Sequence, residues 1–114
     1  MMKMLIKLDE DRIKSDSKYD LSDIWRVIDG KFTAFQCDKE KQADGSVLYS
    51  GNANRDVFGD FFQIYAFLSR EKWFAEYCAQ WIMYSNEDDE DLPLSDENLL
   101  EKLRKNNPLF AHAY

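Results

Sequence analysis

The chain opens on a short apolar run, Met4 to Leu8, which is followed by three consecutive acids. A run of β-prone residues bounded by polar ones predicts a strand. The next segment, Asp9 to Lys18, is charged and polar with a single isoleucine. We therefore expect a surface loop after this strand.

Apolar residues then recur at intervals of three and four, which predicts a helix with one buried face. Asp20 is placed to accept hydrogen bonds from the free amides of the first turn, and Asp23 adds charge that favours the helix dipole. Gly30 costs about 1 kcal/mol relative to alanine inside a helix, so we expect a bend or an early end there. The apolar positions are Leu21, Ile24, Trp25, Ile28, Phe32 and Phe35.

The helical spacing then stops, and Asp44-Gly45 predicts a turn between two strands. The arms of this loose hairpin are Gln36 to Asp38 and Ser46 to Ser50. The small and cap-forming residues from Gly51 to Asn54 lead into the next helix.

Two aromatic helices are predicted next. Val57 to Leu68 has apolar residues on nearly all sides, so we expect this helix either to cross the middle of the domain or to be shared with another protein. Ser69 is placed to cap a second helix that continues to Tyr84, although Met83 to Ser85 also suits an extended segment.

A short helix that Ser95 caps and Pro108 ends completes the order β-α-β-β-α-α-α. The strands are too few for a sandwich and too close together for parallel crossovers. We therefore predict an α+β domain, in which about four helices pack on one face of a small antiparallel sheet of two or three strands. The length of 114 residues predicts one domain, residues 1–114.

Composition limits the function classes. Hydrophobic residues make up 45% of the chain, which is enough apolar surface to fold alone. No stretch approaches the roughly 20 apolar residues of a membrane span, and the first ten residues turn acidic before a signal-peptide core forms. We therefore expect a cytoplasmic protein without membrane contact. Cys37 and Cys78 lack metal or redox spacing and are interpreted as two buried or half-buried thiols, and no motif indicates a cofactor.

The net charge of −7 comes from one segment. Between Ser85 and Glu101 lie eight acids without a lysine or arginine, which leaves 14 acids against 15 bases elsewhere. Such a run predicts a solvated acidic loop at about residues 85–95. The charge disfavours direct binding to nucleic-acid phosphates or anionic lipid, because both repel the chain.

The acidic loop also invites comparison with a helix-loop-helix calcium site. Two positions fail, because Asp91 replaces the glycine of the sharp turn and Pro93 replaces an apolar residue. The solvated loop is therefore preferred over a calcium site. The oxygen-bearing positions of the calcium candidate are Asn86, Asp88, Glu90 and Glu97.

Catalytic chemistry has little support in the sequence. The single histidine, His112, is the third residue from the end of the chain, where chains fray. Neither cysteine has an adjacent histidine or lysine that would activate a thiolate. Asp9 to Asp11 have the ligand types of a divalent metal site, but a solvated turn explains them more simply. We expect a non-enzymatic protein.

The aromatic residues before the acidic loop are either core or partner surface. Our first hypothesis is a protein–protein interaction module that binds a basic and apolar partner, with self-association through the Val57 to Leu68 helix as a further expectation. In size and acidity the chain resembles small accessory proteins of bacteria and their mobile elements, which implies no residue roles. The predicted partner-binding residues are Trp73, Tyr77, Trp81, Tyr84, Glu87, Asp88, Asp89, Glu90 and Asp91.

Two other hypotheses stay open. A DNA-mimic inhibitor needs carboxylates spaced along an extended face, which requires the acids from Asp9 to Asp23 to lie alongside the acidic loop. A small metal-dependent enzyme needs the acids of the N-terminal turn to converge on a metal in a cavity.

Overall fold

The computed structural model describes residues 1–86 and 95–106. In this part of the chain the strands are β1 (Met2–Leu8), β2 (Asp38–Lys41), β3 (Val47–Ser50), β4 (Cys78–Ser85) and β5 (Ser95–Asn98). The helices are α1 (Glu10–Asp16), α2 (Leu21–Thr33), α3 (Val57–Arg70), α4 (Lys72–Tyr77) and α5 (Leu99–Asn106). The predicted α+β class with an antiparallel sheet is confirmed. The predicted counts of two or three strands and about four helices are too low, and the predicted order β-α-β-β-α-α-α is wrong, because the described part of the chain has the order β-α-α-β-β-α-α-β-β-α.

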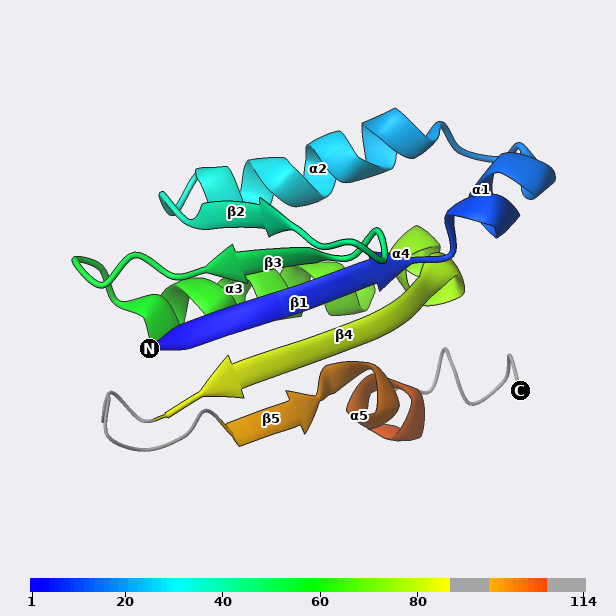
Figure 1. Ribbon diagram of the computed structural model, residues 1–114. Helices are drawn as coiled ribbons and strands as arrows, with labels where there is room; N and C mark the ends of the chain where they lie inside the picture. Colours follow the sequence, from blue (N-terminus) through cyan, green and yellow to red (C-terminus); the bar gives the residue numbers. More distant parts are fainter. Residues whose placement is uncertain (87–94, 107–114) are drawn as a thin grey trace.

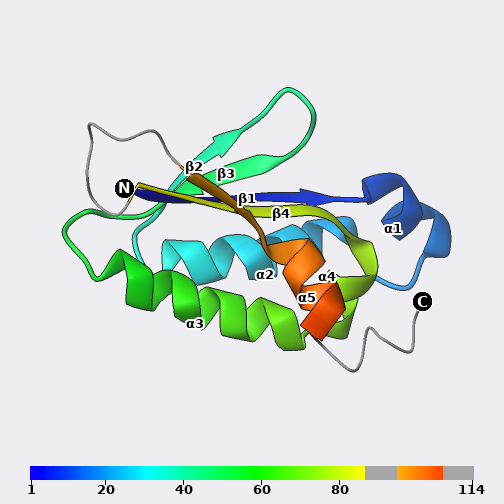
Figure 2. The same ribbon diagram turned by 90° about the horizontal axis from the view of Figure 1, so that it is seen from below.

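The strands form one sheet in the order β2-β3-β1-β4-β5, and every neighbouring pair is antiparallel. Helices α2, α3, α4 and α5 lie on one side of this sheet, and α1 lies beyond the end of β1 (Figures 1 and 2). The other face of the sheet has no helix on it within the described part of the chain. The arrangement is therefore a two-layer one, with the core between sheet and helices.

Strand β1 lies in the centre of the sheet and shows why the two faces differ. Met4 and Ile6 are fully buried and face the helices together with their cross-strand partners. Leu5 points to the opposite face, where its partners are Leu48 and Ile82, and all three are only half-buried. Successive side chains of a strand alternate between faces, so the five apolar residues of β1 divide between core and open face.

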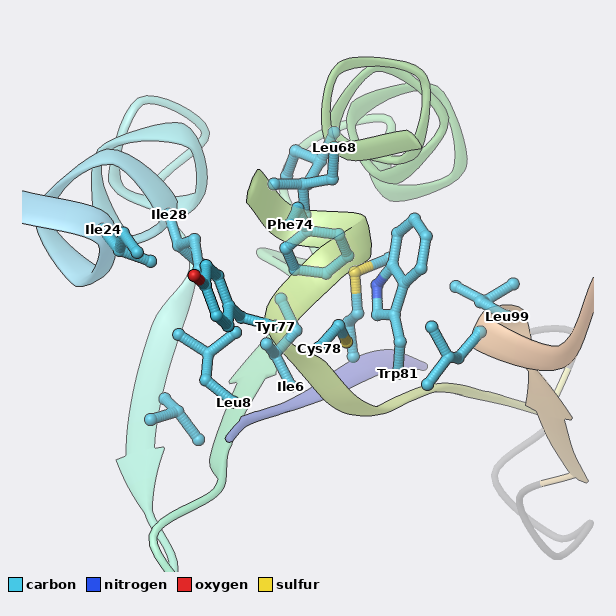
Figure 3. Close-up of a cluster of buried hydrophobic side chains, with 14 of the residues drawn as sticks. Ile6, Leu8, Ile24, Ile28, Leu68, Phe74, Tyr77, Cys78, Trp81 and Leu99 are labelled. Carbon is cyan, nitrogen blue, oxygen red and sulfur yellow. The ribbon is translucent and has the colours of Figure 1, made fainter. Parts of the chain in front are cut away.

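The core between β1 and the helices is rich in aromatic rings. Phe32 of α2 stacks on Tyr49 of β3 with ring centroids 3.8 Å apart, and Trp81 lies between Tyr65 of α3 and Phe74 of α4. Figure 3 shows the part of this core in which Leu68, Phe74, Cys78 and Trp81 gather above β1. The contacts of Trp81, with ring centroids 5.2 Å from Tyr65 and 4.9 Å from Phe74, lie in the range where aromatic pairs stabilise beyond their buried area.

The expected loop at Asp9 to Lys18 is wrong, because this segment contains α1. The Asp9 side chain accepts from the Arg12 amide at 3.2 Å, and the helix ends at Ser17, whose φ is +53°. Ile13 is the one buried residue of α1. A helix of two turns that buries one side chain produces no visible apolar period, which explains the error.

The predicted helix from Ser69 to Tyr84 is wrong at both ends. Ser69 lies within α3 and does not cap α4, and α4 ends at Tyr77, after which β4 begins. Positions four apart share a face in both a helix and a strand, so Tyr77 and Trp81 fitted either structure. The extended alternative for Met83 to Ser85 is confirmed and reaches back to Cys78.

Smaller differences concern element ends. The Asp44-Gly45 turn is confirmed, with φ of +88° at Gly45, but the first arm of the hairpin is Asp38–Lys41 rather than Gln36 to Asp38. Helix α2 continues through Gly30 to Thr33, so the expected early end is wrong. Ser95 begins a strand rather than a helix, and Asn98 caps α5 by accepting from the Glu101 amide at 3.1 Å.

Both edges of the sheet are polar and exposed. β2 reads Asp-Lys-Glu-Lys and β5 reads Ser-Asp-Glu-Asn, and every side chain of the two strands is exposed. Charged edge strands oppose pairing with another chain, so these edges are poor places for a partner strand. No helix of the described residues has the length and apolar character of a membrane span.

Candidate functional site

Two of the predicted partner-binding aromatics belong to the core. Tyr77 is 1% exposed and Trp81 is fully buried. The Tyr77 hydroxyl donates to Asp16 at 2.9 Å, and burial together with this carboxylate raises the Tyr77 pKa to about 12. Neither ring reaches the surface, so their expected contact with a partner is corrected to a packing role.

The other predicted site residues do not form one patch. Trp73 is half-buried on α4 and donates its Nε1 proton to Glu71 at 3.0 Å. Tyr84 is half-buried on the open face of the sheet, opposite Lys3. The five acids Glu87, Asp88, Asp89, Glu90 and Asp91 lie outside the described residues.

Among the described residues, the most exposed aromatic side chains are instead on α3. Phe58 and Phe62 are 69% and 63% exposed. They stand four positions apart and therefore share one face of the helix. The buried face of α3 holds Phe61, Ile64 and Leu68. The near-continuous apolar sequence of this helix predicts that some apolar side chains stay exposed. It does not determine which rings point outward.

The first turn of α3 is fixed by local contacts. The Asp56 side chain accepts from the Gly59 amide at 3.1 Å. Asp60 is 7% exposed, and its carboxylate accepts from Arg55 Nε at 2.9 Å and Arg55 Nη2 at 3.2 Å, which raises the pKa of Arg55. This bidentate contact restrains both side chains, so the first turn of α3, which carries Phe58, is fixed in place.

A chain of contacts links this helix end to Asn86, the described residue that precedes Glu87 in the sequence. A Cβ added to Gly51 would come within 2.2 Å of Val57 Cγ1, so the two residues are in close contact. The Gly51 amide donates to the Met2 carbonyl at 3.0 Å. Asn86 Oδ1 accepts from the Met1 nitrogen at 2.7 Å. Figure 1 shows the N-terminus, the start of α3, the end of β4 and the start of β5 at the same end of the molecule.

We call Met1, Phe58 and Phe62 the apolar end surface. Met1 is 52% exposed, so all three side chains are largely open to solvent. The acidic run, defined as Glu87 to Asp91, follows Asn86 directly in the sequence. Asn86 is in contact with the exposed Met1, and the start of α3 lies at the same end of the molecule.

The calcium candidate is only partly visible in the described residues. The Asn86 side chain accepts from Met1, and Glu97 accepts from Lys102 Nζ at 2.9 Å. Asp88 and Glu90 lie outside the described part. Within residues 1–86 and 95–106, no three acid, histidine or cysteine side chains are grouped as metal ligands. The two described candidates thus have partners other than a cation.

The N-terminal acids are occupied by structural contacts. Asp9 caps α1, Glu10 accepts from Trp25 Nε1 at 3.4 Å, and Asp20 caps α2. They follow the C-terminal end of β1, whereas Ser85 pairs with Met2 at its N-terminal end. The DNA-mimic hypothesis requires these acids beside the acidic run, and they lie at the opposite end of the sheet.

The thiols are not activated nucleophiles. Burial raises the pKa of Cys37 to about 11 and that of Cys78 to about 12, with Asp60 adding to the effect at Cys37. A raised pKa keeps a thiol protonated and unreactive at neutral pH. Both cysteines are free.

Comparison of the chain with models of protein families, with curated proteins and with solved structures finds no match.

Proposed function

We propose that the protein is a non-enzymatic interaction module that binds another protein through the apolar end surface and the adjacent acidic run. The observation that carries this proposal is the exposure of Phe58 and Phe62, each about two-thirds open to solvent on one face of α3. Aromatic side chains are enriched where proteins meet partners, and they dominate the binding energy of many interfaces.

The exposed apolar area is substantial for so small a domain. A phenylalanine side chain offers roughly 200 Å², so the two rings present about 250 Å² of apolar surface before Met1 is added. Patches of a few hundred Å² on a monomer are often functional. The anchored first turn of α3 lowers the entropy lost when these rings are fixed by a partner.

The acidic run indicates which kind of partner surface fits. Five consecutive acids next to exposed rings suit a surface with basic residues around an apolar centre. Opposite charge at the rim mainly raises the association rate, while buried rings slow dissociation. We therefore infer a basic and partly apolar protein partner.

Self-association through α3 alone is less well supported. Two copies that pair their Phe58 and Phe62 rings bury roughly 500 Å², whereas stable interfaces bury at least about 1,200 Å². A partner that also contacts the acidic run buries more area. This comparison favours a partner that covers both features.

The test is affinity capture from the native host with four baits. The apolar variant is F58A/F62A, and the charge variant is E87Q/D88N/D89N/E90Q/D91N. The matched control is V27S, which removes another exposed apolar side chain from α2, 42% exposed. Captured proteins are quantified by mass spectrometry, and the folding of each bait is checked by circular dichroism.

We expect one protein to be recovered by the wild type and by V27S, and to be depleted at least tenfold with both other baits. Direct binding of that purified protein, measured by calorimetry, should weaken in the same pattern. A partner retained by both variants would refute the proposed surface. A host protein other than this chain itself that is lost from only one of them would refute the joint role of rings and acids.

A further inference from the structure

A large cleft lies away from the apolar end surface, between α1, α2 and the β2–β3 hairpin. Its volume is about 1200 Å³. Five cationic and three acidic side chains line it, so the cleft has a surplus of two positive charges on a chain whose net charge is −7. The cations are Lys14, Lys18, Arg26, Lys39 and Lys41.

The three acids of the cleft already have donors. Asp20 accepts from the Ser22 hydroxyl and from the amides of Asp23 and Ser22, and these bonds lower its pKa. Asp29 pairs with Lys39 Nζ at 2.6 Å and accepts from the Tyr49 hydroxyl. Glu10 accepts from the indole of Trp25. Carboxylates that already accept hydrogen bonds or an ion pair compete weakly for the other cationic side chains of the cleft.

Of the five cations, Lys14 and Lys41 have no carboxylate partner within the described residues, and Lys39 pairs with Asp29. Lys18 pairs with Glu76 at 3.1 Å, and Arg26 pairs with Asp23 at 2.9 Å. Within the described residues, the side chains of Lys14 and Lys41 make neither an ion pair nor a hydrogen bond. An incoming carboxylate therefore meets two uncompensated ammonium groups in one cleft.

The wall between these charges is apolar. Leu21 and Trp25, both half-buried, offer the apolar surface of this wall, and the buried side chains of Ile13 and Val47 lie beneath it. A peptide that combines several acids with aliphatic side chains matches this lining. A nucleic-acid strand fits less well, because its evenly spaced phosphates would meet the fixed carboxylates of the cleft.

We propose that this cleft binds the acidic segment of a second copy of the chain. Residues 87–94 read Glu-Asp-Asp-Glu-Asp-Leu-Pro-Leu, which places five acids directly before two leucines. The acids match the lysines of the cleft, and the leucines match its apolar wall. The inference rests on the binding role proposed for the acidic run and names a second copy as one basic and apolar partner.

The segment does not reach the far part of the cleft in its own chain. Ser85 and Ser95 pair with each other, so the nine intervening residues are long enough to extend at most about 17 Å from the sheet. Lys14 lies beyond Leu8, and the strand from Met2, the partner of Ser85, to Leu8 is about 20 Å long. Figure 1 shows α1 at the opposite end of the sheet from the end of β4 and the start of β5. Binding at Lys14 is therefore intermolecular.

The charge distribution permits such a contact. Outside residues 85–101 the chain has 14 acids and 15 bases, so the rest of the second copy hardly repels the incoming segment. The segment and the cleft are different surfaces, so two copies either exchange both segments in a closed two-fold dimer or bind head to tail and leave one segment and one cleft unused. Head-to-tail binding gives chains longer than a dimer at high concentration.

The test measures self-association of the full chain by sedimentation velocity, from micromolar to millimolar protein. The cleft variant is K14E/K41E, and the segment variant is E87Q/D88N/D89N/E90Q/D91N. The matched control, K72E/K105E, reverses the charge of two exposed lysines elsewhere and so has the net charge of the cleft variant. Circular dichroism checks that each variant is folded.

We expect the wild type, the control and F58A/F62A to associate, and the cleft and segment variants to stay monomeric alone. An equimolar mixture of these two variants should form a dimer that does not grow, because it contains one intact segment and one intact cleft. A monomeric wild type at every concentration, or association that survives both charge variants, would overturn the proposal. Association lost only in F58A/F62A would place the contact on α3 instead. Self-association and the capture of a host protein are separate measurements. A wild type that stays monomeric overturns the cleft proposal and leaves the capture result unchanged.

Discussion

Two adjacent phenylalanines on α3 have opposite environments, and their substitution tests the orientation of this helix. Phe61 is 1% exposed and meets Phe32 edge to face at 6.0 Å, whereas Phe62 is 63% exposed. Both residues have the same chemistry and the same helix propensity. Replacement of each by alanine therefore differs only in the packing that is lost.

The expected magnitudes follow from the buried areas. Phe61 buries nearly its whole side chain, roughly 200 Å², and at about 25 cal/mol per Å² this gives an upper limit near 5 kcal/mol. Truncation of a buried phenylalanine typically costs about 3–5 kcal/mol. Phe62 buries about a third of that area, and alanine recovers roughly 0.5 kcal/mol of helix propensity. We expect Phe62→Ala to cost about 1 kcal/mol.

The assay is urea unfolding followed by tryptophan fluorescence and circular dichroism. Phe61→Ala should lower the free energy of unfolding by at least about 2 kcal/mol more than Phe62→Ala, which shifts the midpoint by roughly 1–2 M urea. Equal losses in the two variants, or a larger loss in Phe62→Ala, would refute the assigned orientation of α3. The same data show whether F58A/F62A is folded enough for the binding experiments.

Four further predictions concern the body of the fold. Gly30→Ala should raise the free energy of unfolding by up to about 1 kcal/mol, because nothing lies within 4 Å of the added Cβ, whereas Gly51→Ala should lower it through its clash with Val57; urea titrations that give both changes the same sign contradict this. Both native thiols should react with a maleimide at pH 8 at least about 100-fold more slowly than in urea, with half-buried Cys37 ahead of Cys78, and the rates should rise with pH beyond 10; fast labelling at pH 8 contradicts the raised pKa values. Arg55→Ala should destabilise more than Asp60→Asn, because it leaves a buried carboxylate unpaired while the amide keeps a hydrogen bond; the reverse order in thermal melts would count against the pair. Calcium at millimolar concentration should leave the tryptophan fluorescence unchanged, since Asn86 and Glu97 have protein partners, and a saturable change would revive the calcium site.

Local signals predicted a large part of the fold. Asp20 before an apolar period marked the start of α2, and Asp44-Gly45 marked the hairpin turn. These features depend on neighbours a few residues apart, so the sequence alone contains the physical cause. The antiparallel sheet with helices on one face followed from the order of such elements.

Long-range pairing was the part that the sequence pattern did not contain. Residues from Cys78 to Ser85 suit a helix by spacing, but pairing with β1 along its whole length makes them a strand. That change turned Trp81 from a candidate surface residue into the centre of the core. The exposed rings of Phe58 and Phe62 were not identified either, because the sequence of α3 is apolar on almost every side and only its packing decides which side is covered.

The central claim is that the exposed rings of α3 and the neighbouring acidic run form one binding surface. It is tested most directly by nuclear magnetic resonance of the labelled protein during titration with the purified partner from the capture experiment. We expect the largest chemical-shift changes at Phe58, Phe62 and Met1 and in the acidic run. Changes confined to the open face of the sheet around Leu5 and Tyr84, with Phe58 and Phe62 unaffected, would contradict it.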